Sequence, residues 1–457
     1  MSDLSAIAAL LADPSRFITT PAVVGRLSKD FYWYSPVLRP LLENKQADAV
    51  AQPVDADEIV RILSHCYAHN IPVTPRGAGT GNYGQAIPLN RGLVLDLSRM
   101  DRILSIDPGG VAECEPGVRL AVLEAEAALQ GWELRCYPST IAKATLGGFL
   151  GGGSGGIGSV AHGALRDFGT VRALEFVTME ATPRVLQVER DDVHQILHAW
   201  GTNGVISRIW LALTPRVEWS QCAAAFPTFA AAFNFCEAIA SGAAWTKRLV
   251  TAFEWPIPSY FSPIAPLVRD RQALAFFLMA TPECEAWRAA CVAAGGDVTF
   301  AASYAGPRTT PLLSDYTWNH TTLWAIKHDA RFTYLQCGFD PDRAREQMRL
   351  LKEHFADEIL FHMEWMKNAA ERVTPGAIPL VRFTTVERLQ QIIDLCREIG
   401  VFVANPHVNN VEDGGRFRED NVQLLAKHRY DPKGLLNPGK MLSFQPRAEP
   451  GTAVPAS

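Results

Sequence analysis

The order of apolar and polar positions predicts a helix that leads into a short strand. Asp55 can cap this helix, and Glu58, three positions later, completes a capping-box pattern. The next apolar positions recur with the spacing of one helical face: Ile59, Ile62, Leu63 and Cys66. The strand comes next, at residues 71–74.

The same alternation continues along the first half of the chain. A second helix is predicted over residues 118–130, with Gly131 as its stop signal, and apolar strands are predicted at residues 93–97 and 173–178. Strands and helices that alternate between glycine-rich loops predict an α+β domain.

After Pro215 the chain becomes rich in Trp and Phe and predicts a separate α+β domain. Strands are expected at residues 274–279 and 331–336, and helices near residues 283–294, 342–355 and 386–399. Thr384 and Glu387 supply a capping signature for the last helix, and Gly400 supplies its stop.

Residues 71–84 carry the most informative pattern, because a short strand there runs into a glycine loop with one arginine. Gly77, Gly79 and Gly81 can adopt positive φ, and their N–H groups can form an anion-binding nest that Arg76 reinforces. The diphosphate of a dinucleotide is the natural guest of such a loop. A generic glycine turn is the competing interpretation.

Residues 79–84 match the G-x-G-x-x-G pattern of a Rossmann site, but the segment after them does not predict a helix. Residues 85–92 contain a proline and a glycine and lead into the strand at 93–97. The loop therefore joins strand to strand, and a diphosphate would rest on the loop itself without a helix dipole behind it.

A second glycine cluster, at residues 149–159, predicts a surface without side chains against which something flat or closely packed lies. A flexible linker is the alternative. Residues 144–147 on one side and the hydrophobic strand at 173–178 on the other argue against a linker.

Four motifs in order carry a resemblance to a known family. The segments Pro75–Thr80, Ala144–Gly148 with the glycine run after it, Gly201–Ile206 and Leu436–Lys440 look like motifs of the FAD-linked oxidoreductases of the vanillyl-alcohol oxidase / p-cresol methylhydroxylase family. Four ordered motifs are much more specific than any one of them. The resemblance spans residues from about 45 to 215 and the C-terminal 40 or so, and the region between is only loosely matched.

The resemblance implies an α+β fold in which a two-lobed PCMH-type FAD-binding domain carries an α+β substrate, or cap, domain. Residues 1–45 would be an N-terminal extension, partly helical, with aromatic residues at 31–34, and residues 46–217 would be the FAD-binding domain. Residues 218–400 would form the cap, whose sheet lies over the flavin ring, and residues 401–457 would return to the FAD-binding domain.

The same resemblance implies FAD as the cofactor and a set of residues that hold it. They are Pro75, Arg76, Gly77, Ala78, Gly79, Thr80, Gly81, Asn82, Pro138, Thr140, Thr145, Gly148, Gly152, Gly155, Gly158, Ser159, Gly204, Val205, Ile206 and Asn437. Some branches of the family attach the flavin to a histidine in the first loop, where this chain has Ala78-Gly79-Thr80. The flavin is therefore expected to be noncovalent.

The implied activity is that of an FAD-dependent oxidase or dehydrogenase. It would remove a hydride from a C–H next to oxygen or nitrogen, with a small 2-hydroxy acid or alcohol favoured, and pass electrons to oxygen or another acceptor. One alternative is an aromatic or amine substrate. Another is a flavin-carrying electron-transfer subunit of a larger oxidase complex, as occurs beside glycolate oxidase catalytic subunits.

Three residues are candidates for the catalytic groups. His407 follows the apolar strand at 401–404, and His320 lies in the polar and aromatic segment 318–329. Arg382 offers a bidentate fork for a carboxylate. The competing interpretations are a surface-loop histidine at 407 and an amphipathic segment with core tryptophans at 318–329.

No metal is expected. The D-2-hydroxyacid dehydrogenase branch of the family typically carries a H-x-x-G-D-G-N-x-H-like motif, and this sequence does not contain one. The nearest imitations are His362 with Glu364 and His407 with Glu412, and neither pair has convincing ligand spacing.

Composition agrees with an enzyme of two domains. The chain has 457 residues, of which 48% are hydrophobic, and a net charge of −5 without a basic run, which argues against nucleic acid as a partner. No segment predicts a membrane span or a signal peptide, so a cytoplasmic location is expected, with a small-molecule substrate and a homodimer as a candidate assembly. Nine cysteines without a C-x-x-C predict buried reduced thiols.

Overall fold

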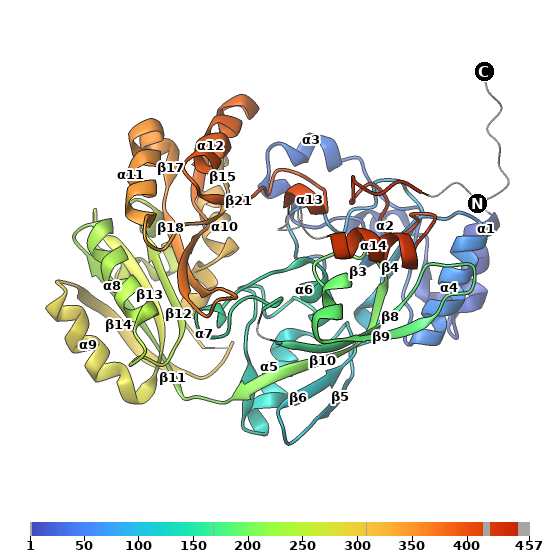
Figure 1. Ribbon diagram of the computed structural model, residues 1–457, viewed down its shortest axis with the longest axis horizontal. Coiled ribbons are helices and arrows are strands. Elements are labelled where there is room, and N and C mark those ends of the chain that lie inside the picture. The colour runs from blue at the N-terminus through green and yellow to red at the C-terminus, as the bar shows by residue number, and fades with distance from the viewer. Residues whose placement is uncertain (1, 168, 308, 415–420, 447–457) are drawn as a thin grey trace.

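The computed structural model describes residues 2–167, 169–307, 309–414 and 421–446, and the chain forms two lobes (Figure 1). One lobe contains the first half of the sequence together with the red C-terminal helix α14 (Asn421–Tyr430). The other contains the green-to-orange middle of the chain. The short helices α6 (Leu146–Gly152) and α7 (Ser159–His162) lie between them.

The first sheet has the strand order β1-β2-β4-β3, in which β2, β4 and β3 are parallel and β1 is antiparallel to β2. Its strands are β1 (Phe17–Ile18), β2 (Ala49–Ala51), β3 (Val73–Arg76) and β4 (Leu93–Asp96). Helix α4 (Ala56–Ala68) packs on it through the predicted apolar face. Asp55 caps this helix by accepting from Glu58 N at 2.8 Å.

The Glu58 side chain does not return to Asp55, as a full capping box would require. It accepts instead from Val54 N and forms a buried ion pair with Arg16, whose Nη1 lies 2.6 Å from Glu58 Oε2. Because β1 follows Arg16 directly, this pair fastens the N-terminal segment to the first sheet. The remaining helices of that segment are α1 (Ser2–Ser5), α2 (Pro21–Leu27) and α3 (Leu38–Leu42).

The second sheet of this lobe is antiparallel, with the order β5-β6-β10-β8-β9 and with β7 paired to β10. Helix α5 (Leu120–Leu129) lies within the predicted range 118–130. The strands are β5 (Ile103–Ile106), β6 (Val111–Cys114), β7 (Trp132–Leu134), β8 (Val171–Val177), β9 (Val185–Glu189) and β10 (Val205–Pro215).

The other lobe is built on an eight-stranded sheet of order β14-β11-β13-β12-β18-β19-β16-β21. Its strands are β11 (Trp219–Phe226), β12 (Lys247–Phe253), β13 (Ala273–Ala280), β14 (Asp297–Tyr304), β16 (Gln336–Gly338), β18 (His362–Lys367), β19 (Val373–Ala377) and β21 (Phe402–Ala404). A three-stranded sheet of order β15-β20-β17 accompanies it: β15 (Phe332–Tyr334), β17 (Ile359–Leu360) and β20 (Leu380–Arg382). The helices are α8 (Phe229–Ser241), α9 (Cys284–Ala293), α10 (Asn319–His328), α11 (Ala344–Phe355) and α12 (Val386–Glu398).

Most predicted elements of this lobe are confirmed, with two corrections. The strand expected at 331–336 is two strands in different sheets, β15 and β16, because the chain crosses between the sheets at Leu335. Helix α12 is capped by Thr385, which accepts from Arg388 N at 3.1 Å, and not by Thr384. All nine cysteines are free thiols, and all except Cys284 are buried.

The chain ends by returning to the first lobe through α13 (Val411–Gly414) and α14. Leu436 forms a parallel bridge with Val73 of β3. The buried Lys427 donates through Nζ to the backbone oxygens of Thr202 and Leu436, each at 2.8 Å, and pairs with Asp431. No helix among the described residues is long and apolar enough to cross a bilayer.

Replacing Lys427 with methionine is expected to lower the free energy of unfolding by about 3–5 kcal/mol, because Asp431 and two carbonyl oxygens would stay buried without their partner. Urea denaturation measures the change. The exposed Lys45→Met is the control and should shift stability by less than about 0.5 kcal/mol. A similar small shift for both variants would contradict this role of Lys427.

Candidate active site

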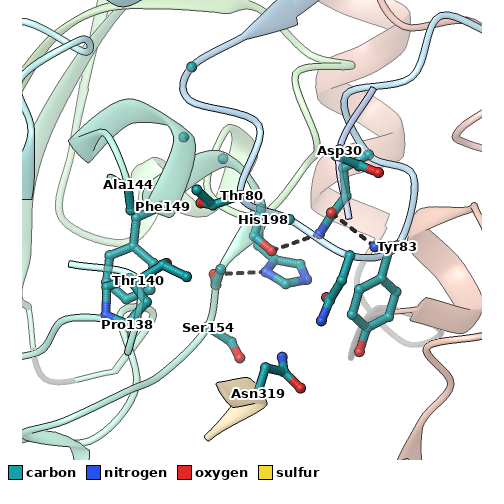
Figure 2. A pocket seen from close by; sticks show the side chains of 18 of the residues that line it. Asp30, Thr80, Tyr83, Pro138, Thr140, Ala144, Phe149, Ser154, His198 and Asn319 are labelled. Atoms are coloured by element: carbon teal, nitrogen blue, oxygen red, sulfur yellow. Dashed lines mark hydrogen bonds between the residues drawn. The ribbon is translucent and has the colours of Figure 1, made fainter. Parts of the chain in front are cut away.

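A cavity of about 630 Å³ lies where the glycine-rich segments of the first lobe meet the other lobe (Figure 2). Residues 75–83 form one wall and residues 138–155 form another. Segments 315–323 and 336–338 of the second lobe also contribute to the lining. A cavity of this size is in the range that holds a cofactor or a drug-sized ligand.

The first glycine loop connects β3 to β4 without a helix, as predicted. Gly79 has a φ of +66°, which only glycine adopts readily. A Cβ on Gly77 would lie 2.1 Å from Thr145 Oγ1, so the two glycine-rich segments pack directly on each other. This close approach leaves the backbone of both segments exposed to the cavity.

Arg76 supports the first loop from behind. Its Nη1 donates to Lys29 O at 2.6 Å and its Nη2 donates to Ala78 O at 3.3 Å. A Cβ on Gly79 would lie only 2.2 Å from this guanidinium. Burial lowers the pKa of Arg76, while Asp96 and Asp30 raise it. The guanidinium therefore shapes the loop and places positive charge next to it.

Gln85 joins the two glycine-rich segments. Its Nε2 donates to Gly152 O at 3.1 Å, and its Oε1 accepts from Tyr83 N at 3.3 Å. A Cβ on Gly81 would lie 2.2 Å from the same Oε1. Tyr83 lies beside these contacts at the edge of the cavity in Figure 2.

The second segment contains a helix that was not predicted, α6. Thr145 accepts from Gly148 N at 3.4 Å to cap it. Glycine is among the weakest helix formers, so local propensity did not indicate a helix here. The small residues nevertheless let this helix lie close to residues 198–200. The contact is made by two backbone hydrogen bonds: His198 N donates to Leu150 O, and Trp200 N donates to Gly151 O.

Residues 198–201 form a strained wall of the cavity. His198 and Trp200 both have a φ of +53°, which is uncommon for residues with a side chain. His198 Nδ1 donates to Gly153 O at 2.9 Å, as Figure 2 shows. Asn437 holds this segment by donating to Trp200 O at 2.7 Å and to Gln85 O at 2.8 Å.

Asp30 and Lys440 are both buried beside the first loop, where their charges interact, and sequence reasoning missed this pairing. Asp30 accepts from Tyr32 N and Ala86 N, and Lys440 Nζ donates to Gly84 O at 2.7 Å. Burial raises the pKa of Asp30 to about 6 and Lys440 lowers it, while burial lowers the pKa of Lys440 to about 7 and Asp30 raises it. No local pattern in the sequence marked Asp30, since its position depends on the packing of the N-terminal segment.

Trp318, Asn319 and His320 bring polar groups into the cavity from the second lobe. Trp318 has a φ of +52°, and its backbone N–H donates to Glu364 Oε1 at 2.8 Å. Trp318 Nε1 and Asn319 Oδ1 are buried and have no hydrogen-bond partner within the described structure. Strained backbone next to unsatisfied polar atoms is typical of a functional site.

His320 is the predicted catalytic residue that lines the cavity. Its side chain is 20% exposed, and its Nδ1 lies 3.9 Å from Asp315 Oδ1. Burial lowers the pKa of His320 to about 4, although the backbone of Asp315 raises it. The imidazole is therefore neutral near pH 7 and able to accept a proton.

His407 and Arg382, the other two catalytic candidates, lie outside the residues that line the cavity. His407 is buried: its Nδ1 accepts from Ser35 Oγ at 2.8 Å and its Nε2 donates to Tyr334 O at 2.9 Å, so both nitrogens are engaged. Arg382 pairs with Asp329 at 3.1 Å and stacks over Phe332. These contacts are structural.

Most of the residues expected to hold the cofactor line the cavity. Those that do not are Gly158, Ser159, Val205 and Asn437. Residues that line the cavity and were missed include Asp30, Phe31, Tyr34, Tyr83, Gln85, Ser139, Lys143, Gly147, Phe149, Ser154, Arg166, His198, Trp200, Asp315, Trp318, Asn319 and Gln336. Among the described residues, no group of three or more His, Cys, Asp or Glu side chains could hold a metal ion.

The walls of the cavity fit FAD. Backbone N–H groups of the first loop and the adjacent Arg76 suit a diphosphate. At Gly77 and Gly81 a Cβ would collide with Thr145 and Gln85, so the first loop has no room for a side chain at these two positions. Asn319 Oδ1 adds an acceptor without a partner in the described structure.

Comparisons with known proteins agree with this assignment. Residues 47–187 match the family described as FAD binding domain. An uncharacterized FAD-linked oxidoreductase of Mycobacterium tuberculosis H37Rv is 26% identical over 226 residues, which cover 48% of this chain and 47% of that protein. The glycolate oxidase subunit GlcD of Bacillus subtilis is 37% identical over 179 residues, or 37% of this chain and 38% of that protein.

A D-lactate dehydrogenase of Archaeoglobus fulgidus is 29% identical over 207 residues, which cover 43% of this chain and 46% of that protein. The matched region thus spans less than half the length of each of these relatives. Among solved structures, an alkyldihydroxyacetonephosphate synthase matches with a TM-score of 0.73 and 18% identity, over 96% of this chain and 85% of that one. At this identity the match shows the fold alone.

Replacing Gly77 with alanine is expected to weaken FAD binding by at least about 10-fold, because the new Cβ would displace Thr145 and separate the two glycine-rich segments. Titration of apoprotein with FAD, followed by flavin fluorescence, measures the dissociation constant. Gly25→Ala is the control, since a Cβ there would meet its nearest atom at 3.6 Å. Equal affinities for both variants would refute the steric role of Gly77.

Proposed function

On the premise that this chain belongs to the FAD-linked oxidoreductases through the FAD binding domain of residues 47–187, we propose that it oxidises a 2-hydroxy acid. The observation that carries the proposal is His320, a neutral imidazole in the wall of the same cavity as the glycine loops. A proton acceptor beside a flavin site is the group that oxidation of a hydroxyl-bearing carbon requires.

Bound FAD would take the hydride from the substrate C–H bond and pass the electrons on to an acceptor. The chain itself supplies binding, orientation and proton transfer. The two glycine-rich segments hold the diphosphate, and the second lobe holds the substrate against the site. The His320 imidazole takes the hydroxyl proton as the C–H bond breaks.

Two groups in the cavity wall suit the carboxylate of a hydroxy acid. Lys143 lines the cavity with an exposed side chain and has no ion-pair partner among the described residues. The Trp318 indole offers a buried N–H donor. The names of the relatives, glycolate oxidase subunit and D-lactate dehydrogenase, support the same substrate class.

Substituting glutamine for His320 is expected to slow flavin reduction by about 10²–10⁴-fold, because the amide cannot accept the proton. Anaerobic stopped-flow absorbance with excess hydroxy acid measures the rate. His328→Gln is the matched control, since His328 lies on the same helix but outside the cavity wall, and it should keep the wild-type rate. An unchanged rate in the His320 variant would eliminate its role as the base.

The rate of flavin reduction should also depend on pH in a defined direction. Because burial lowers the pKa of His320 to about 4, the imidazole accepts protons above that value and loses this capacity as the pH falls through it. The rate should be flat from about pH 6 to 8 and fall below about pH 5. If the rate of flavin reduction instead fell as the pH dropped through about 6.5, an exposed histidine or another group would control the reaction.

The mode of FAD attachment is read from the visible spectrum before and after acid precipitation. The expected result is flavin absorbance at about 450 nm that moves to the supernatant, as noncovalent FAD requires. Colour in the pellet would indicate a covalent bond. A colourless protein that does not take up added FAD would contradict the cofactor assignment.

The same preparation distinguishes the alternatives. Bleaching of the flavin by amines or simple alcohols, but not by hydroxy acids, would replace the proposed substrate class. No bleaching by any substrate, together with copurification of a partner, would favour an electron-transfer subunit.

A further inference from the structure

One side of the cavity is an apolar wall. Five residues belong both to a single hydrophobic cluster and to the cavity lining: Phe31, Tyr34, Trp318, Leu323 and Ile378. They come from the N-terminal segment, from the start of α10 and from the turn after β19. Three segments distant in sequence thus build one continuous surface.

This wall is rigid. Tyr34 and Ile378 are each 5% exposed, and Tyr34 packs edge-on against the fully buried Tyr334 with ring centroids 6.2 Å apart. Phe31 packs against Tyr34 with its centroid at 6.2 Å. Burial raises the pKa of Tyr34, so its phenol stays neutral. A preformed apolar surface binds an apolar group without a large ordering cost.

Helix α10 places this wall next to the proton acceptor. Leu323 follows His320 by three positions and Asn319 by four, and residues at these spacings share one face of a helix about 5–6 Å apart. All three line the cavity. A group bonded to the carbon that carries the hydroxyl would therefore reach Leu323 when the hydroxyl is at His320.

The cations that line the described cavity, Lys143, Arg76 and Arg166, lie outside the five residues of the apolar wall. Lys143 lines the cavity, and its charge contributes to lowering the pKa of His320. Asp315, which is exposed, also lines the cavity, and its Oδ1 lies 3.9 Å from His320 Nδ1. A second carboxylate carried on the substrate side chain would lie against the apolar wall, whose five residues include no cation.

From these contacts, and on the basis of the function proposed above, we propose that the substrate is a monoanionic 2-hydroxy acid with an apolar side chain of several carbons or an aromatic ring. Its carboxylate lies toward Lys143 and the Trp318 indole, its hydroxyl faces His320, and its side chain lies on Leu323, Ile378 and Tyr34. Glycolate and lactate leave this surface unfilled.

The test is a series of 2-hydroxy acids that differ in the side chain: glycolate, lactate, 2-hydroxybutanoate, 2-hydroxyhexanoate, 3-phenyllactate and 2-hydroxyglutarate. Anaerobic stopped-flow absorbance gives the second-order rate constant of flavin reduction for each. The rate constant should rise about 4-fold for each buried methylene, so that 2-hydroxyhexanoate exceeds lactate by roughly 60-fold. 2-Hydroxyglutarate should react more slowly than 2-hydroxyhexanoate.

Equal or greater rate constants for glycolate and lactate, or a preference for 2-hydroxyglutarate, would overturn the inference and leave hydroxy-acid oxidation intact. If no member of the series reduces the flavin, the proposed function fails, and the inference fails with it.

Leu323→Ser tests the wall directly. This variant should reduce the preference for 2-hydroxyhexanoate over lactate by about 10-fold, because the longer side chain loses its apolar contact. Leu395→Ser is the matched control: Leu395 is partly buried in α12 of the same lobe but does not line the cavity. An unchanged preference in the Leu323 variant would exclude this wall as the side-chain site.

Discussion

Direct contact between two glycine-rich segments is the constraint on which the site depends. Gly77 lies so close to Thr145 that a Cβ would come within 2.1 Å of its hydroxyl. The cavity exists because the backbones meet there without side chains and because Arg76 and Gln85 fix the shape of the first loop.

Distant parts of the chain hold this contact in place. Asn437 donates to the backbone of both Gln85 and Trp200, and Lys440 donates to Gly84. These residues follow the first loop by more than 350 positions, as the separation of 356 between Lys440 and Gly84 shows. A buried lysine is costly unless its donors are used, and the hydrogen bond to the Gly84 carbonyl, with the favourable charge of Asp30, stabilises Lys440.

The second lobe contributes the reactive side of the cavity through a short strained turn. Glu364 on β18 accepts the backbone N–H of Trp318, and the buried His362 bonds the same carboxylate at 2.9 Å. These buried polar residues therefore support the turn that presents Asn319 and His320 to the cavity. His362 with Glu364 resembles a metal pair in sequence, but its observed contacts within the described structure are structural.

Local patterns let the sequence predict the strand-to-strand glycine loop, the FAD-binding motifs and helices such as α4, α5, α11 and α12, because glycine density and apolar periodicity are local properties. It did not determine which histidine faces the cavity. His407 and His320 look equivalent in the sequence, yet packing engages both nitrogens of one and leaves the other in the wall. Helix α6, Asp30 and the apolar wall of Tyr34 and Leu323 also required the tertiary structure, since each depends on contacts between segments far apart in the chain.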